Sequence, residues 1–409
     1  MNVWKNISHS MRALVGKPVQ NDAYKIKLLR DTIKQVEWFD YKQEDWDAST
    51  ALLEKKPPPF DDGAAKRIVW LLCNFEHPFG GVYTVLRIAN ELQNRGWDNC
   101  IIVYDNPKFT IDSQIQDITK YFPYLNNRNF IAFNGDERTL PRAECAVGTF
   151  WSSCYLLLKM KTVRAKAYLI QDFEPGFYAA GTTYALAENT YRMPFHRLFN
   201  TQGLMQYINT NYPQRQVRSL SFTPAVDKRY RFVQKSISRP VRVLFYARPN
   251  TPRNAFELVV AMARALKEHY GAAVQLVAAG ERAGLYAELC AGVMEFVGVV
   301  DYEKLPQFYA SFHVVVSFML TKHPSYLPFE AMACGCAVIV NENEANTWLL
   351  RDGENCVVAA PCISSLLEAF EWLMQKGAYE HVVTNGVETV SQFRWNGELR
   401  RIDIFLKSL

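Results

Sequence analysis

Two arginines that follow one apolar run are the clearest candidates for binding an anion. The run Val241–Tyr246 predicts a buried strand, Arg248 and Arg253 come after it, and a helix is predicted to begin near Ala255. Guanidinium groups offer forked hydrogen-bond donors that suit a diphosphate. Solvated surface arginines are the usual alternative, but a position after a parallel strand favours ligand binding.

Carboxylates form a second group of candidates. Asp172 and Glu174 follow the predicted strand 167–170, and Glu330 lies in the first turn of a helix predicted at 329–334. A carboxylate at a strand end could orient a ligand that carries hydroxyl groups, because an ionised carboxylate can accept two hydroxyl hydrogen bonds at once. The alternatives are a helix cap for Asp172 and a surface position for Glu174.

Two glycines, a histidine and two tyrosines are candidates of other kinds. Gly80 and Gly81 lie between a predicted strand and a predicted helix, where backbone amides without a Cβ beside them could approach an anion; a tight turn is the alternative. His323 could donate to a phosphate or a sugar, or be an ordinary loop histidine. Tyr178 and Tyr326 could stack on a sugar or a base, and core packing would explain them equally well.

These candidates follow strands in two series of alternating strands and helices. The first series has apolar runs at 67–74, 100–104, 145–150 and 167–170, with helices at 82–95 and 182–192. The second has strands at 241–246, 274–278, 296–297, 314–317 and 337–340, with helices at 255–268, 304–311 and 329–334. This alternation predicts an α/β fold of two doubly wound, Rossmann-like domains that face a cleft, with ligands beyond the carboxyl ends of the strands.

The order of these elements predicts four segments. Residues 1–65 form an N-terminal helical extension and linker, because a helical pattern at 24–38 is followed by three consecutive prolines. The two Rossmann-like domains span 66–235 and 236–390. A last helix at 391–409 is expected to cross back to the first domain.

Composition argues against several classes of protein. The 409 residues are 49% hydrophobic and 21% charged, which indicates globular domains rather than disorder. A net charge of +5, without a basic stripe, argues against nucleic-acid binding. The nine cysteines lie mostly in apolar runs, so we expect reduced thiols and no metal site. Without a run of roughly 18 apolar residues or a signal peptide, a cytoplasmic protein is expected.

The segment KHPSYLPFEAMACGCAVIV at residues 322–340 is the most specific motif of the chain. It resembles the donor signature of retaining glycosyltransferases with the GT-B fold, of the glycosyltransferase family 4 type. The resemblance extends over much of residues 65–400. It implies that the first domain binds an acceptor, and that the second binds a nucleotide-sugar, as a substrate rather than a cofactor.

The resemblance also implies roles for single residues. Glu330 would accept hydrogen bonds from the nucleotide ribose, and Arg248 and Arg253 would bind the phosphates. Gly80 and Gly81 resemble the glycine loop of the family's first domain. The remaining donor-binding candidates are Lys304, Ser325 and Tyr326, and the catalytic candidates are Asp172, Glu174 and His323.

One position departs from the family pattern. The family has another glutamate eight residues before the one that matches Glu330, and this chain has Lys322 there, so the local contact to sugar or phosphate must differ. The variant motif, together with segments at 170–178 and 245–257, resembles bacterial rhamnosyltransferases that extend rhamnan-type surface glycans from dTDP-rhamnose.

The expected function is therefore metal-independent transfer of L-rhamnose from dTDP-rhamnose, with retention, to a hydroxyl of a glycan or lipid-linked oligosaccharide. The alternatives are a nucleotide-sugar epimerase of the same fold and an inactive glycan-binding scaffold. Lys322, in place of the family's glutamate, is the feature that supports the scaffold alternative. A nicotinamide-dependent oxidoreductase is disfavoured, because the glycine spacing after Gly80 lacks its fingerprint. No nucleic-acid partner is expected; contact with the inner face of the cell membrane and a homodimer are left open.

Overall fold

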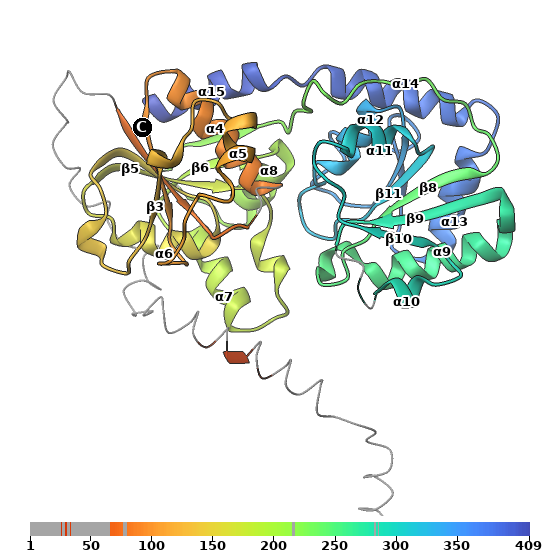
Figure 1. Cartoon of the computed structure of the whole chain (residues 1–409), viewed down its shortest axis with the longest axis horizontal. Coiled ribbons are helices and arrows are strands. Elements are labelled where there is room, and N and C mark those ends of the chain that lie inside the picture. Colours follow the sequence, from red (N-terminus) through yellow and green to blue (C-terminus); the bar gives the residue numbers. More distant parts are fainter. Residues whose placement is uncertain are drawn as a thin grey trace, which may run out of the picture. The chain divides into compact units, whose positions relative to one another are not determined.

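Two parallel β-sheets form the framework of the structure, a computed structural model (Figure 1). The structure describes residues 26, 29, 30, 33, 66–76, 80–214, 217–281, 284 and 286–409. The chain divides into two compact units, Met1–Thr50 and Ala51–Leu409, and both sheets belong to the second. Apart from four helical positions, the predicted extension at 1–65 lies outside the described residues, and its role stays a prediction.

The first sheet has seven strands in the order β3-β2-β1-β4-β5-β6-β7, and all of its pairs are parallel. Its strands are β1 (Arg67–Leu72), β2 (Asp98–Val103), β3 (Phe130–Ala132), β4 (Ala143–Gly148), β5 (Val163–Ile170), β6 (His196–Asn200) and β7 (Ser219–Phe222). In β1 every residue except Arg67 is buried, as expected of a parallel strand covered on both faces.

Helices connect the strands of this sheet. They are α4 (Gly81–Asn94), α5 (Ile115–Tyr121), α6 (Trp151–Lys159), α7 (Thr182–Asn189) and α8 (Gln202–Asn211), with short 3₁₀ helices η2 (Asn127–Asn129), η3 (Glu137–Thr139), η4 (Glu174–Phe177) and η5 (Thr190–Arg192). Helix α4 buries Val85, Ile88 and Leu92, which share one helix face. These side chains belong to the core that also contains Trp70 of β1.

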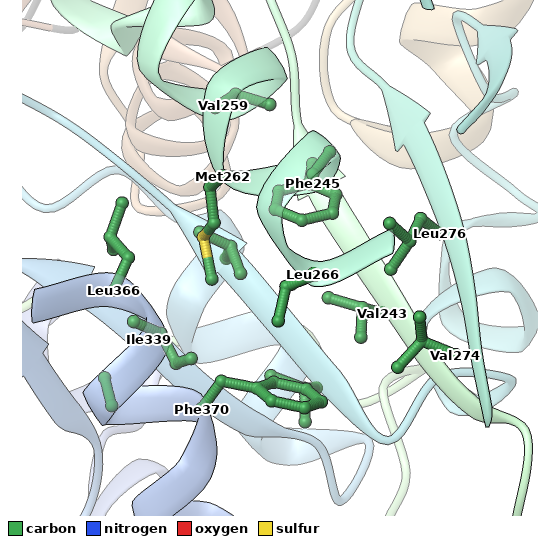
Figure 2. Close-up of a cluster of buried hydrophobic side chains, with 14 of the residues drawn as sticks. Val243, Phe245, Val259, Met262, Leu266, Val274, Leu276, Ile339, Leu366 and Phe370 are labelled. Carbon is green, nitrogen blue, oxygen red and sulfur yellow. The ribbon is translucent and has the colours of Figure 1, made fainter. Parts of the chain in front are cut away.

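The second sheet has six parallel strands in the order β10-β9-β8-β11-β12-β13. They are β8 (Val241–Tyr246), β9 (Val274–Ala279), β10 (Glu295–Gly298), β11 (Val314–Ser317), β12 (Ala337–Asn341) and β13 (Val357–Ala359). Figure 2 shows a core in which side chains of β8, β9 and β12 meet those of two helices, α9 and α13. Because both faces of this sheet are apolar, its strands are nearly continuous hydrophobic runs.

The helices of the second half follow the same alternation. They are α9 (Phe256–Tyr270), α10 (Tyr286–Cys290), α11 (Leu305–Ala310), α12 (Leu327–Ala333), α13 (Ile363–Leu373), α14 (Ala378–Ser391) and α15 (Trp395–Lys407), with 3₁₀ helices η6 (Pro252–Asn254) and η7 (Gly271–Ala273). Helix α15 packs against α4 and β7, and Trp97 donates its indole N–H to Asp403 of α15 at 2.9 Å. The last helix therefore contacts the elements of the first sheet.

The predicted fold class is confirmed, since two doubly wound parallel sheets are present. Helix ends differ from the sequence prediction by one to three residues: the helix predicted at 329–334 begins two residues earlier, at Leu327, and the stretch 182–192 ends as a 3₁₀ turn. The predicted domain boundaries stay predictions. Within the described residues, no helix is long and apolar enough to cross a bilayer.

Candidate active site

The order of strands reverses between β8 and β11 in the second sheet. In doubly wound sheets, ligands bind beyond the carboxyl ends of the strands at such a reversal. The segments that follow these two strands carry Arg248 and Arg253 after β8, and His323, Ser325 and Tyr326 after β11. The topology therefore gathers five of the predicted site residues at one edge.

Unpaired polar atoms concentrate in this region. Among the described residues, ten buried side-chain nitrogen or oxygen atoms lack a hydrogen-bond partner. Six of them lie at the ends of β5, β6, β8 and β11 or in the segments that follow these four strands: Gln171 Oε1, Asn200 Oδ1, Arg253 Nε, Asn254 Oδ1, Ser317 Oγ and His323 Nε2. Buried polar atoms are normally satisfied by protein, water or a ligand. Six such atoms at the ends of β5, β6, β8 and β11 indicate a site for a polar ligand.

Arg253 is the most constrained of the predicted phosphate ligands. Its guanidinium carbon lies 3.9 Å from the ring centroid of Phe177, which belongs to η4 of the first half of the chain. Burial lowers the pKa of Arg253, the nearby Asp172 opposes that, and the second arginine, Arg248, lowers it further. The two positive charges repel each other, and an anion near both guanidinium groups would offset that repulsion. This pair therefore favours a diphosphate.

Asp172 links the two halves of the chain. Its Oδ2 accepts a hydrogen bond from the Thr321 hydroxyl at 2.7 Å, and its Oδ1 accepts from the Phe173 N–H at 2.7 Å. Burial raises the pKa of Asp172 to about 6, and these hydrogen bonds oppose the rise. The predicted catalytic carboxylate lies at the site, but both of its oxygens already have protein partners.

Glu174 lies inside the first domain and not on its surface. Its side chain is 2% exposed, and Oε2 accepts hydrogen bonds from the backbone N–H of Trp151 at 2.5 Å and from the Tyr168 hydroxyl at 2.8 Å. Trp151 is the first residue of α6, so this carboxyl accepts from one of the backbone N–H groups that have no partner within the helix at its N-terminus. The surface position considered from the sequence is wrong, and these contacts indicate a structural role.

A Glu174→Gln variant should keep sugar-transfer activity within roughly threefold of wild type, because an amide oxygen can accept both hydrogen bonds. Burial raises the pKa of Glu174 from 4.5 to about 8. Between these values only the folded state holds the proton, so wild-type stability falls as the pH rises. Melting temperatures measured between about pH 4.5 and about pH 8 should vary less with pH for Glu174→Gln than for the wild type. If Glu174→Gln were stable but inactive, Glu174 would have a catalytic role after all.

His323 has a neutral ring with one unpaired N–H donor. Its Nδ1 accepts the Ser325 backbone N–H at 3.0 Å, which leaves the ring proton on Nε2, and that atom is buried without a partner. Burial lowers the pKa of His323 to about 3, so the ring stays uncharged at neutral pH. The side chain is therefore suited to donate one hydrogen bond to a ligand, and unsuited to act as a proton-transferring acid.

Ser325 and Tyr326 shape the loop between β11 and α12. Ser325 has φ of 68°, a left-handed conformation that is rare for a residue with a side chain and typical of functional loops. The Tyr326 hydroxyl is 3.0 Å from Thr84 Oγ1 and accepts from Asn200 Nδ2 at 3.0 Å. Because both partners belong to the first half of the chain, Tyr326 connects the two halves, and its hydroxyl is already occupied.

Glu330 lies in the first turn of α12, as predicted, and is half-buried. Burial raises the pKa of its carboxyl to about 7, while hydrogen bonds from Tyr230 and Tyr309 and the charge of Arg229 oppose the rise. With a pKa near 7, this carboxyl is present in both protonation states at neutral pH. Hydrogen bonds from the hydroxyls of a ribose would favour its ionised form.

The glycines and Lys304 differ in their relation to the site. Gly80 has φ of 50° and precedes α4, and the carbonyl of Gly81 accepts from the Gln171 side chain at 3.2 Å, which brings the glycine loop beside the end of β5. Lys304 is 73% exposed and pairs with Asp301 at 3.1 Å. In the described part of the chain, no hydrogen bond or ion pair connects Lys304 with the other candidates.

Several residues at this edge were not predicted from the sequence. Thr321 binds Asp172, and Asn254, fully buried, donates to the Phe318 carbonyl at 2.8 Å while its Oδ1 stays unpaired. Ser317 and Asn200 are the last residues of β11 and β6. A polar residue that ends an apolar strand run is a signal that could have indicated them. Among the described residues, no group of three or more histidine, cysteine or acidic side chains could hold a metal ion.

Two doubly wound domains with converging polar loops define the GT-B fold. Residues 241–371 match the family model of the WsaF C-terminal domain, and residues 152–202 match that of the WsaF N-terminal domain. The first match contains Glu330 and the basic candidates, and the second contains Asp172. The two matches lie in different halves of the chain, each similar to one of the two WsaF domains.

A curated relative is similar over most of this chain. The chain is 34% identical over 344 residues to the O-antigen biosynthesis protein RfbC of Myxococcus xanthus. The aligned region is 83% of this chain but 27% of that relative, so the chain spans about a quarter of its length.

Solved structures share the fold at low sequence identity. HepE of Anabaena, in complex with UDP and glucose, has a TM-score of 0.66 at 15% identity and covers 84% of this chain and 100% of its own. Sucrose-phosphate synthase of Thermosynechococcus elongatus has a TM-score of 0.64 at 15% identity, covering 84% and 98%. The pneumococcal O-GlcNAc transferase GtfA, with UDP and GlcNAc, has 0.63 at 10% identity, covering 84% and 99%. These likenesses establish the GT-B fold.

Proposed function

We propose that this protein is a retaining glycosyltransferase that transfers L-rhamnose from dTDP-rhamnose to a hydroxyl of a surface glycan or a lipid-linked oligosaccharide. The GT-B fold, the WsaF domain matches and the O-antigen biosynthesis relative support a glycosyltransferase of surface-glycan synthesis. The resemblance of the segment 322–340 to rhamnosyltransferases supports the sugar and the base.

One observation carries the proposal. Arg253 Nε and His323 Nε2 are buried donors without protein partners, at the edge where the strand order reverses. When the glycosidic bond to the donor breaks, negative charge develops on the leaving diphosphate. Donors held in place before the reaction stabilise that charge without reorganisation. This arrangement suits departure of a nucleoside diphosphate without a metal ion.

The roles of the acidic groups follow from their contacts. Glu330 would accept the ribose hydroxyls of the donor, since it lies in the first turn of α12, the helix that follows β11 at the reversal. Asp172 would hold the loop containing Thr321 against the first domain. Without an unoccupied carboxylate nucleophile among these residues, we propose same-face attack by the acceptor hydroxyl, with its proton passing to the leaving diphosphate.

Calorimetric titration of the purified protein with dTDP, UDP and GDP, without magnesium, tests the donor site. Tight binding of dTDP alone, lost in Glu330→Ala and kept in Glu257→Ala on the exposed face of α9, would support the proposal. If the wild type binds no nucleotide, the proposed donor site is refuted, and an inactive glycan-binding scaffold becomes the better explanation. Product analysis with dTDP-rhamnose and a rhamnose-terminated acceptor separates transfer from epimerisation, because an epimerase needs no acceptor.

Affinity for dTDP-rhamnose should rise with pH through neutrality. Burial places the pKa of Glu330 at about 7, and ribose hydroxyls bind its ionised form. One pH unit below that value about nine-tenths of the carboxyl is protonated, so the dissociation constant should be roughly tenfold larger at about pH 6 than at about pH 8. Glu330→Gln should bind weakly with a flat profile. If the affinity of Glu330→Gln rose with pH as that of the wild type does, a group other than Glu330 would be responsible for the pH dependence.

A further inference from the structure

Lys322 is held between the two halves of the chain. Its ammonium lies 2.5 Å from Glu344 Oε1 and 5.1 Å from the ring centroid of Tyr207, which belongs to α8 of the first domain. The Lys322 side chain is 21% exposed. Its backbone N–H donates to Asp172. Lys322 is therefore a half-buried cation fixed beside His323, at the edge that carries the unpaired donors.

Glu344, the partner of Lys322, is held in place but open to solvent. Its side chain is 69% exposed, and the hydrogen bond from Lys322 lowers the pKa of its carboxyl, so it is ionised at neutral pH. The adjacent Asn343 is buried and donates to the carbonyls of Met319 and Thr321. The loop after β12 is thus bonded to the loop after β11, and the Glu344 carboxylate faces solvent.

Three other carboxylates of this region already have protein partners. Asp172 binds Thr321 and a backbone N–H, and Glu174 is enclosed beside α6. Glu330 accepts from two tyrosine hydroxyls. Glu344, in contrast, is ionised, oriented by one cation and open to solvent. An ionised carboxylate has about four acceptor positions, and the single bond from Lys322 leaves most of them for a ligand.

We propose that Glu344, oriented by Lys322, accepts hydrogen bonds from two neighbouring hydroxyls of the transferred sugar. This inference rests on the proposed function, because it places the sugar next to the diphosphate contacts of Arg253 and His323. Lys322 is then a positioning residue, since it acts through Glu344. The site would select a sugar ring that carries two adjacent free hydroxyls and would disfavour one whose hydroxyl is replaced by an acetamido group.

The test compares Glu344→Gln with Glu342→Gln, a control in the same loop whose side chain is also exposed. Loss of a hydrogen bond to a charged group should lower kcat/KM for dTDP-rhamnose by roughly 10- to 100-fold in Glu344→Gln, while the dissociation constant for dTDP, which has no sugar, stays within about twofold. Glu342→Gln should behave as wild type in both assays. Melting temperatures check that both variants are folded.

Variants of Lys322 complete the test. Lys322→Met should lose sugar-dependent affinity as Glu344→Gln does, and Lys322→Arg should restore it, because guanidinium can also pair with the carboxylate. An unchanged kcat/KM in Glu344→Gln, or an equal loss of dTDP affinity, would overturn the inference. Failure of the wild type to bind dTDP would instead reject the proposed function, so the two failures are distinguishable.

Discussion

Replacing Arg253 by alanine should lower the rate of sugar transfer by roughly 100- to 1,000-fold, the loss observed when one preorganised donor to a developing anion is removed. The guanidinium is stacked on Phe177, its Nε is unpaired, and it lies at the end of the strand where the order of the sheet reverses. Steady-state kinetics with saturating dTDP-rhamnose measures the effect. The loss should appear mainly in kcat, because the charge on the diphosphate grows as the bond breaks.

Two further variants separate charge from packing at this position. Arg264→Ala removes an exposed arginine from α9 of the same domain and should leave the rate unchanged. Arg253→Lys keeps the charge but loses the planar group that stacks on Phe177 and should recover part of the rate. If Arg253→Ala transferred sugar within threefold of wild type, the proposed phosphate site would be refuted.

The fold could be predicted because its signals are local. Runs such as Val241–Tyr246 are apolar over several residues, and helices with one apolar face alternate with them. The sequence also indicated the strand-to-helix positions of Arg253 and Glu330. Parallel sheets convert such positions into a common edge, because the carboxyl ends of their strands point the same way.

Contacts between distant segments could not be predicted in the same way. The sequence places Glu174 two residues after Asp172, which made both look like site residues. Only the contact between the start of α6 and η4 encloses Glu174, while Asp172 is bonded to Thr321. The pairing of Lys322 with Glu344 likewise depends on two loops that follow different strands. Single-sequence patterns carry no information on which loops meet.

Gly203→Ala is expected to disable transfer without unfolding either domain. Gly203 lies in α8 of the first domain, and a Cβ added there would be 1.6 Å from the Ala345 carbonyl oxygen and 2.7 Å from the Trp348 indole nitrogen, both in the second half of the chain. Backbone atoms cannot yield to such an overlap, so the loop after β12 must move away. Because Ala345 adjoins Glu344, this movement would displace the proposed sugar contact.

The expected loss in kcat/KM is roughly 100-fold, which corresponds to the upper end of the about 1–3 kcal/mol that overpacking costs. Alanine is intrinsically better than glycine inside a helix by about 1 kcal/mol, so α8 itself should not be weakened. Gly397→Ala in α15 is the matched control, since no atom lies within 4 Å of its added Cβ. Small-angle scattering should show a larger radius of gyration for Gly203→Ala alone. Wild-type kinetics in Gly203→Ala would mean that close contact between α8 and the Ala345 loop is not needed for transfer.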